Sequence, residues 1–234
     1  MYLALYDISP LKRERPVGVD MLVVRELTGG TYRRAEVQGE SFEHASARST
    51  RSSTPTPRCG AGWVTAFQLA SQRRHKVTSV DKANVLESSR LWRQVVDDVA
   101  KDFTGIVLEH RLVDSAAMRL ITQADSFDAI VTENMFGDIL TDEAAVLAGL
   151  LGLLPSASLG DKGPGLYEPV HGSAPDIAGK GIANPIGSVL SVAMLFRHSL
   201  HLMDEALDRA RRRGGHRAAA SALPTWAARP TPRR

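Results

Sequence analysis

Short β-branched or apolar stretches alternate with longer stretches of helical period along most of this 234-residue chain. The expected strands are 20–25, 76–80, 105–110 and 128–132, and the expected helices are 64–75, 85–102, 114–124, 138–151 and 186–204. The stretch KVTSV (76–80) has the composition of a strand, whereas 85–102 repeats apolar residues at helical spacing. Strands that alternate with helices predict an α/β fold with mostly parallel pairing.

The positive charge of the chain is confined to two segments. The formal net charge is +3 and the pI is 9.2, values that would suit a nucleic-acid-binding protein. However, 44–80 and 209–234 contain no Asp or Glu, and they hold 14 of the 29 basic residues. The remainder of the chain is acidic, with 26 acidic side chains against 15 basic ones. The pattern therefore argues against a nucleic-acid partner.

Composition also limits the compartment. No apolar run approaches the roughly 20 residues that a membrane helix needs, and no secretory signal is evident at the N-terminus. The single cysteine, Cys59, fits a reducing cytosol. We therefore expect a cytoplasmic protein with no membrane association. Segments 44–62 and 209–234 hold few apolar groups and are expected to be disordered.

Two aspartates in FGDILTDEA (136–144) are candidates for a metal site. Asp138 and Asp142 are four residues apart, which on a helix brings both carboxylates to one face. Paired carboxylates favour a bound cation, and hard oxygen ligands suit Mg²⁺ or Mn²⁺. The alternative is that both residues lie near a helix N-terminus and interact with its dipole.

The segment SVDKANVLE (79–87) marks the end of an expected strand. Residues at such a strand end often face a ligand crevice, and Lys82 can donate a proton or a hydrogen bond there. The alternative is a surface lysine followed by a helix-capping Asn84.

The glycine-containing segment VRELTGGTY (24–32) offers two further polar groups. Arg25 presents a fork of donors matched to a carboxylate, and Tyr32 can donate a proton. A strand-edge arginine and a tyrosine packed on a glycine turn are the structural alternative.

The segment YEPVHGSAPDIAGKGIANP (167–185) is rich in Gly, Pro and short polar residues. Such a loop can wrap a nucleotide through its backbone N–H groups, although it lacks a GxGxxG fingerprint. A purely structural loop is the alternative.

Taken in order, these motifs resemble one enzyme family. SPLK, GVDMLVVRELTGGTY, VTSVDKANVLESSRLWR, VTENMFGDILTDEA, LLPSASLG and YEPVHGSAPDIAGKGIANP are similar to the isopropylmalate branch of the decarboxylating isocitrate/isopropylmalate dehydrogenases. The match covers about 1–43 and 63–208. It implies NAD-dependent oxidative decarboxylation of 3-isopropylmalate in leucine biosynthesis, by a homodimer that uses Mg²⁺ or Mn²⁺.

The resemblance also implies roles for individual residues. Tyr32, Lys82 and Asp114 correspond to catalytic residues, and Arg25, Asn84 and Val85 to residues near the dicarboxylate substrate. Asp138 and Asp142 correspond to metal ligands of the home subunit, with Asp114 donated across the dimer; Lys82 likewise acts in the partner's site. His171, Gly172, Ser173, Ala174, Pro175, Asp176, Ile177 and Asn184 correspond to the NAD loop. A carboxylate such as Asp176 accepts hydrogen bonds from ribose hydroxyls and repels a 2′-phosphate, which favours NAD over NADP.

The resemblance implies a two-domain α/β fold, in which this chain leaves the first domain incomplete. Residues 1–149 are expected to form the substrate, metal and dimerisation domain, with 150–208 a fragment of the NAD-binding domain and 209–234 a disordered tail. The family pattern begins before Met1, so we expect an N-terminally truncated copy. Segments 44–62 and 209–234 depart from the pattern in a way that suggests frameshifts. A catalytically inactive remnant that at most dimerises is therefore the alternative to an active dehydrogenase.

Overall fold

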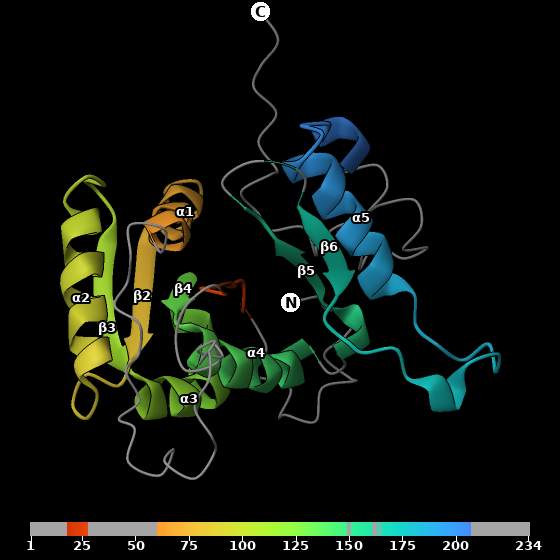
Figure 1. Ribbon diagram of the computed structural model, residues 1–234, viewed down its shortest axis with the longest axis horizontal. Coiled ribbons are helices and arrows are strands. Elements are labelled where there is room, and N and C mark those ends of the chain that lie inside the picture. The colour runs from red at the N-terminus through yellow and green to blue at the C-terminus, as the bar shows by residue number, and fades with distance from the viewer. Residues whose placement is uncertain (1–17, 28–59, 149–150, 161–162, 164, 207–234) are drawn as a thin grey trace, which may run out of the picture. The chain divides into compact units, whose positions relative to one another are not determined.

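The computed structural model describes residues 18–27, 60–148, 151–160, 163 and 165–206 (Figure 1). The chain divides into two compact units. The first, here called the sheet unit, comprises Met21–Leu120 and Phe127–Thr141. The second, the hairpin unit, comprises Met1–Asp20, Ile121–Ser126 and Asp142–Arg234. The predicted division at residue 149 into two domains stays a prediction.

A parallel sheet forms the centre of the sheet unit. Its strands are β1 (Leu22–Arg25), β2 (Lys76–Asp81), β3 (Val107–Leu112) and β4 (Ala129–Thr132). Their order is β1-β4-β2-β3, and each neighbouring pair is parallel. The sheet confirms the predicted α/β class. Strand β4 is buried along its whole length, as expected of an apolar strand between two others.

All five predicted helices are present, and they differ from the predictions in where they begin and end. They are α1 (Gly60–Ser71), α2 (Glu87–Ala100), α3 (Val113–Thr122), α4 (Asn134–Ala148) and α5 (Ile186–His198), with short 3₁₀ segments η4 (Ala124–Ser126), η5 (Leu151–Leu153) and η6 (Pro175–Ile177). Helix α1 begins at Gly60, so 60–62 are helical and not disordered. The rest of 44–62, and all of 209–234, lie outside the described residues.

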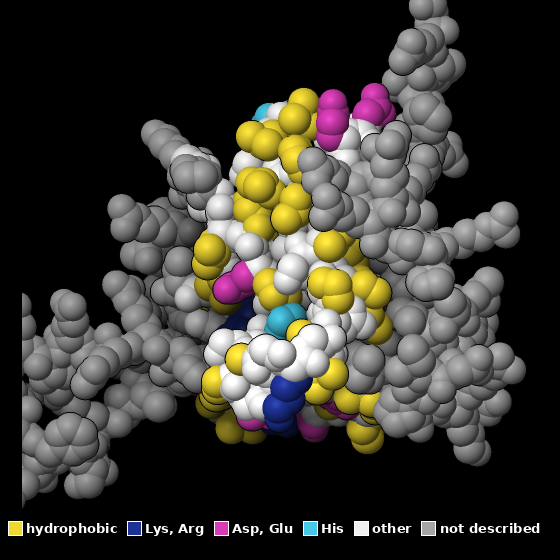
Figure 2. Space-filling view, turned by 90° about the vertical axis from the view of Figure 1, so that its right-hand side faces the viewer, with side chains coloured by type: hydrophobic (Ala, Val, Ile, Leu, Met, Phe, Trp, Pro, Cys, Tyr) yellow, Lys and Arg dark blue, Asp and Glu magenta, His cyan; other side chains and the backbone are white. Residues whose placement is uncertain are grey.

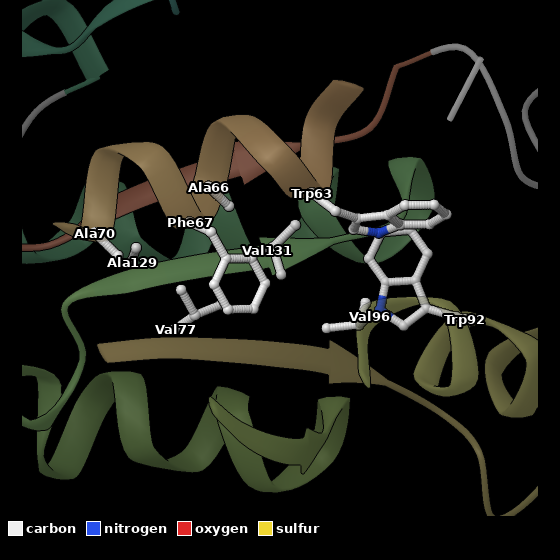
Figure 3. Close-up of a cluster of buried hydrophobic side chains, with 9 residues drawn as sticks. All are labelled: Trp63, Ala66, Phe67, Ala70, Val77, Trp92, Val96, Ala129 and Val131. Atoms are coloured by element: carbon white, nitrogen blue, oxygen red, sulfur yellow. The ribbon is translucent and has the colours of Figure 1, made fainter. Parts of the chain in front are cut away.

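The core of the sheet unit lies where α1 and α2 pack on β2 and β4 (Figure 3). Phe67 of α1 is fully buried with Val77 and Val131. Trp63 and Trp92 meet edge to face, with ring centroids 5.0 Å apart. Trp92 also donates from Nε1 to the Oγ atom of Ser79 at 2.9 Å, so this indole buries its polar atom with a partner.

The buried carboxylate of Asp128 organises the amino end of the parallel sheet. Asp128 accepts hydrogen bonds from Nε of Arg73 at 2.8 Å and from the backbone N–H of Arg74 at 2.9 Å. The Lys76 N–H also donates to it, at 3.3 Å. The prediction that this helix extends to residue 75 was therefore wrong. The helix ends at Ser71, because the following basic residues are held by Asp128.

In the hairpin unit, α5 packs on an antiparallel pair formed by β5 (Pro155–Ser158) and β6 (Leu166–Pro169). Gly187 permits this close approach, because a Cβ atom there would lie 3.1 Å from Cβ of Pro169 in β6. The predicted helix 186–204 is too long. Helix α5 ends at His198, and Ser199 exchanges a hydrogen bond of 2.7 Å with the Tyr167 hydroxyl.

Hydrophobic side chains gather on the surface shown in Figure 2. The exposed apolar side chains of the hairpin unit include Leu159, Leu166, Val170, Ile182, Val192, Leu200, Leu202 and Met203. Among the described residues of this unit, β5, β6 and α5 offer too little surface to bury apolar groups on every side. No helix in the described part of the chain is long and apolar enough to span a membrane.

We expect Asp128→Ala to lower the free energy of unfolding by about 3–5 kcal/mol, because it leaves the buried Arg73 guanidinium without its carboxylate. Urea unfolding followed by circular dichroism measures the change. The control is Asp102→Ala, at an exposed position past the end of α2, which should change stability by less than about 0.5 kcal/mol. Equal effects of the two substitutions would contradict this role for Asp128.

Candidate functional site

The carboxyl ends of the parallel strands bring most of the predicted catalytic and substrate residues to one edge of the sheet. Arg25 ends β1 and pairs in register with Thr132, the last residue of β4. Val80 of β2 also pairs with Thr132, so Asp81 and Lys82 follow at the same level. Asp114 follows β3, whose last residue pairs with Asp81. In open α/β sheets this edge is where ligands bind.

Arg25 is held by the first turns of α4. Its Nε and Nη2 atoms donate to Oδ1 of Asn134 at 2.9 and 2.7 Å, and its Nη1 atom lies 2.7 Å from Oδ1 of Asp138. Asn134 in turn donates from Nδ2 to the carbonyl oxygen of Leu27 at 3.2 Å. The Arg25 side chain is 28 % exposed. Arg25 thus ends the edge strand β1, and these contacts hold its guanidinium in one orientation.

Gly137 makes room for this arginine. A Cβ atom at residue 137 would lie 2.7 Å from Cγ and 3.0 Å from Cδ of Arg25, which is closer than real Cβ contacts. The arginine side chain therefore crosses the helix where no side chain projects. The motif VTENMFGD contains both Asn134 and Gly137, but nothing in their spacing showed that they serve Arg25.

Asp138 and Asp142 lie well inside α4. The helix begins at Asn134, and its first turn has no acidic residue. The alternative that both aspartates stabilise a helix N-terminus is therefore wrong. Asp138 pairs with Arg25, whereas Asp142 is exposed and no described side chain pairs with it.

The donor set of these two aspartates is compatible with a divalent cation. Both are hard oxygen ligands and lie one helical turn apart. The guanidinium of Arg25 also pairs with Asp138, and its positive charge opposes a second cation at this carboxylate. Among the described residues no group of three His, Cys, Asp or Glu side chains forms a metal cluster. Further ligands would therefore have to come from water, substrate, another chain or residues outside the described ranges.

Lys82 and Asp114 lie together. The Lys82 Nζ atom is 2.9 Å from Oδ1 of Asp114, and this hydrogen bond holds the pKa of Asp114 below its ordinary value. Asn84 and Val85 are exposed in the turn that follows. Helix α2 begins at Glu87 with Leu86 at its N-cap position, so the alternative in which Asn84 caps the helix is wrong.

The predicted nucleotide-binding residues lie in one continuous segment of the hairpin unit, between β6 and α5. These are His171, Gly172, Ser173, Ala174, Pro175, Asp176, Ile177 and Asn184. Ala174 has a positive φ of 42°, which turns the chain into η6, where Asp176 is exposed. The Asn184 side chain accepts a hydrogen bond of 3.0 Å from the Ile186 N–H at the start of α5. Tyr32 lies outside the described residues.

Two carboxylic acids at the sheet edge were missed by the sequence analysis. Asp81, 1 % exposed, binds Arg93 through both oxygens, with distances of 2.6 and 3.0 Å. Glu133 follows β4 next to Asp81. Burial raises the pKa of Glu133, and the negative charge of Asp81 raises it further. A single sequence does not show which acids lie side by side on neighbouring strands.

The contact between Gly137 and Arg25 predicts an energetic coupling. Gly137→Ala should lower the free energy of unfolding by about 1–3 kcal/mol, because the new Cβ overlaps the arginine. In an Arg25→Ala background the loss should shrink by at least about 1 kcal/mol, since alanine is otherwise favoured over glycine in a helix. Urea unfolding of the four chains gives the coupling energy. Equal effects in both backgrounds would show that the overlap is not felt.

Glu133 predicts a pH dependence of stability. Its pKa is raised in the folded chain, so its contribution to stability is present below its ordinary value of 4.5 and is lost as pH rises through the folded value. We expect Glu133→Gln to raise the thermal midpoint at neutral pH and to change it little near pH 4. Glu87→Gln, at an exposed carboxylate, is the control. A midpoint shift that is the same at both pH values would refute the assignment.

Comparison with known proteins places this geometry in a family. Residues 1–213 match the family model described as isocitrate/isopropylmalate dehydrogenase. A 3-isopropylmalate dehydrogenase of Anaeromyxobacter dehalogenans is 56 % identical over 204 residues, which are 87 % of this chain and 58 % of that protein. The 3-isopropylmalate dehydrogenase of Bacillus subtilis is 54 % identical over 210 residues, 88 % and 57 % of the two chains. The chain thus spans rather more than half the length of these curated relatives.

Solved structures give the same assignment. The crystal structure of isocitrate dehydrogenase from Methylococcus capsulatus aligns with a TM-score of 0.73 and 37 % identity, covering 90 % of this chain and 62 % of that one. The β-decarboxylating dehydrogenase from Thermococcus kodakarensis, in its apo form, aligns with a TM-score of 0.59 and 42 % identity, covering 71 % of this chain and 52 % of that one. The chain belongs to the isocitrate/isopropylmalate dehydrogenase family.

Proposed function

We propose that the protein is a 3-isopropylmalate dehydrogenase, which oxidises the 2-hydroxyl of its substrate with NAD⁺ and releases the β-carboxylate as CO₂. The observation that carries the proposal is the pairing of Arg25 with Asp138 at the carboxyl edge of the sheet. It brings a guanidinium cation, whose charge attracts a substrate carboxylate, beside an aspartate suited to a metal ion. The relatives named 3-isopropylmalate dehydrogenase favour this substrate over isocitrate.

In this proposal Arg25 binds one carboxylate of the dicarboxylate substrate. Asn134 and Gly137 hold the guanidinium in one orientation, so little side-chain freedom is lost when the substrate binds. Asn84 and Val85, exposed after β2, are the proposed neighbours of the substrate and the nicotinamide. The cation of Arg25 then offsets the negative charge that a dicarboxylate brings to a site already containing Asp138.

Asp138 and Asp142 hold Mg²⁺ or Mn²⁺, with Asp114 of the partner subunit as the third carboxylate ligand. When bound, the divalent cation supplies Lewis-acid polarisation of the substrate oxygen. Asp138 and Asp142 come from one helix, so α4 sets the distance between them. Because Asp114 comes from the second subunit, the proposal requires a homodimer.

Lys82 is the proposed proton-transfer residue, together with Tyr32. Its Nζ atom can give up or accept a proton at the substrate oxygen, and Asp114 keeps the ammonium in place meanwhile. Lys82 and Asp114 are adjacent in one chain and both are assigned to the partner's site. A single contact across the dimer would therefore deliver both groups.

The loop 171–184 is the proposed NAD site. Asp176 lies exposed on η6, where it can accept hydrogen bonds from the ribose hydroxyls. The same carboxylate would repel the 2′-phosphate of NADP, which favours NAD. The proposed compartment is the cytoplasm, where leucine biosynthesis would supply the substrate.

Metal binding provides a test that does not require turnover. We expect Asp138→Asn and Asp142→Asn each to weaken Mn²⁺ binding at least tenfold, since each removes one charged ligand worth more than about 1.4 kcal/mol. Electron paramagnetic resonance of free Mn²⁺ measures the affinity. Glu143→Gln, the next residue on α4, is the control and should leave binding unchanged. The same loss at all three positions would mean nonspecific attraction to acidic residues.

Turnover tests the substrate. With NAD and Mn²⁺, 3-isopropylmalate should yield NADH and CO₂ in equal amounts, and isocitrate should yield neither. Arg25→Met should lower kcat/KM roughly 10- to 100-fold, because a charge-assisted hydrogen bond is worth about 1.5–3 kcal/mol. Arg119→Met, at an arginine of α3, is the control. Preference for isocitrate, or no turnover by the dimer, would overturn the proposal.

A further inference from the structure

One face of α2 lies against both the hydrophobic core and the turn that carries Lys82. Ser89, Trp92, Arg93 and Val96 have the i, i+3, i+4, i+7 spacing of a single helix face. Trp92 and Val96 belong to the core cluster (Figure 3). Ser89 and Arg93 are polar and contact the end of β2 instead. The same helix face therefore has an apolar part for packing and a polar part directed at one turn.

The polar part fixes the backbone on both sides of Lys82. The Lys82 N–H donates to Oγ of Ser89 at 3.1 Å, and Ser89 is 2 % exposed. The preceding residue, Asp81, accepts hydrogen bonds from Nε and Nη2 of Arg93 through its carboxylate. The same carboxylate accepts a hydrogen bond of 2.8 Å from the Ala83 N–H. The backbone at Lys82 is thus bonded to Ser89, and the residues on either side, Asp81 and Ala83, are bonded to each other.

The carbonyl side of the turn is equally constrained. The Lys82 carbonyl oxygen accepts from the N–H groups of Val85 and Leu86, both at 2.9 Å. The tip of the side chain meets Asp114. Lys82 therefore has its backbone N–H, its carbonyl oxygen and its Nζ atom all engaged, which leaves the side chain few alternative positions.

The Asp81–Arg93 pair is an unusual way to stabilise a helix–strand contact. Removing a nearly buried carboxylate from water is costly, and apolar replacements of buried ion pairs often leave stability unchanged or increase it. The contact already has an apolar core in Trp92 and Val96. What the ion pair adds is direction, because a bidentate arginine fixes the carboxylate plane and, through Oδ1, the Ala83 N–H.

We infer that Ser89 and Arg93 are positioning residues for Lys82, acting through its backbone and through Asp81. The inference rests on the proposed catalytic role of Lys82. Neither residue is proposed to touch substrate. Their effect is to keep the Nζ atom at the sheet edge beside Asp114, where a misplacement of about 1 Å costs on the order of 100-fold in rate.

The reactivity of Lys82 toward an acylating reagent tests this on the folded chain without any substrate. Peptide mass spectrometry after brief treatment with acetic anhydride gives the acylation rate of Lys82 relative to Lys101, whose side chain is 74 % exposed. In Ser89→Ala and Arg93→Met, the loosened Lys82 should leave Asp114 more often and react roughly threefold to fivefold faster, the range set by loss of a partly exposed ion pair. The matched controls are Ser88→Ala and Gln94→Met, at neighbouring residues of α2.

Circular dichroism and urea unfolding establish which variants are folded. A loss of global stability does not change Lys82 acylation while the chain remains folded. If Arg93→Met does not fold, the double variant Asp81→Asn/Arg93→Met removes the unpaired charge but keeps an oxygen for the Ala83 N–H. It should react at a rate between those of the wild type and Ser89→Ala. Acylation rates within the range of the two controls, in folded variants, would overturn the inference.

Kinetics separate this inference from the proposed function. In an active dimer, Arg93→Lys keeps the charge but loses the fork, so kcat should fall about tenfold or more with KM unchanged. Faster acylation with no 3-isopropylmalate oxidation by the wild type would keep the positioning role and reject the proposed function. Full kcat in folded Arg93→Lys and Ser89→Ala chains would reject the positioning role alone.

Discussion

The parallel register of the sheet is the constraint on which the candidate site depends. Strand β4 lies between β1 and β2, and its last residue, Thr132, is in register with both Arg25 and Val80. Parallel strands end at the same edge, so the residues that follow them lie at the same edge too. Residues separated by more than a hundred positions in sequence, such as Arg25 and Asn134, thereby form direct hydrogen bonds.

Pairs of opposite charge then set the orientations along this edge. Arg25 pairs with Asp138, Lys82 with Asp114 and Arg93 with Asp81. Each pair joins a strand end or the turn after it to a neighbouring helix. The three pairs differ in burial, because Asp81 is almost fully buried whereas Asp114 is exposed. The buried pair holds backbone in place, and the two more accessible pairs leave their charged groups near solvent, where ligands can reach them.

Gly137 and Asn134 of α4 support the orientation of Arg25 at this sheet edge. Gly137 is in an ordinary helical position, so its value is not conformational freedom but the absence of a side chain where Arg25 crosses. Asn134 joins the guanidinium to the Leu27 carbonyl oxygen, which links the start of α4 to the chain after β1. The first turns of α4 therefore orient an arginine as well as carrying Asp138.

The order of the elements and the α/β class were determined by the sequence itself, because β-branched runs and helical periodicity are local properties that tertiary contacts seldom reverse. The motifs singled out Arg25, Lys82, Asp114 and Asp138. That they lie at one sheet edge or on its adjoining helices is a finding of the structure, and their assigned roles stay predictions. The ends of the elements were not determined by local sequence alone, since α1 ends where Asp128 binds Arg73. The proximity of Glu133 to Asp81, the space that Gly137 leaves for Arg25 and the hydrogen bond from the Lys82 N–H to Ser89 were decided only by the tertiary structure. Each of these three features depends on the register between strands or on the face that a helix turns toward the strands. The spacing of residues along the chain encodes neither the register nor the orientation of the helix.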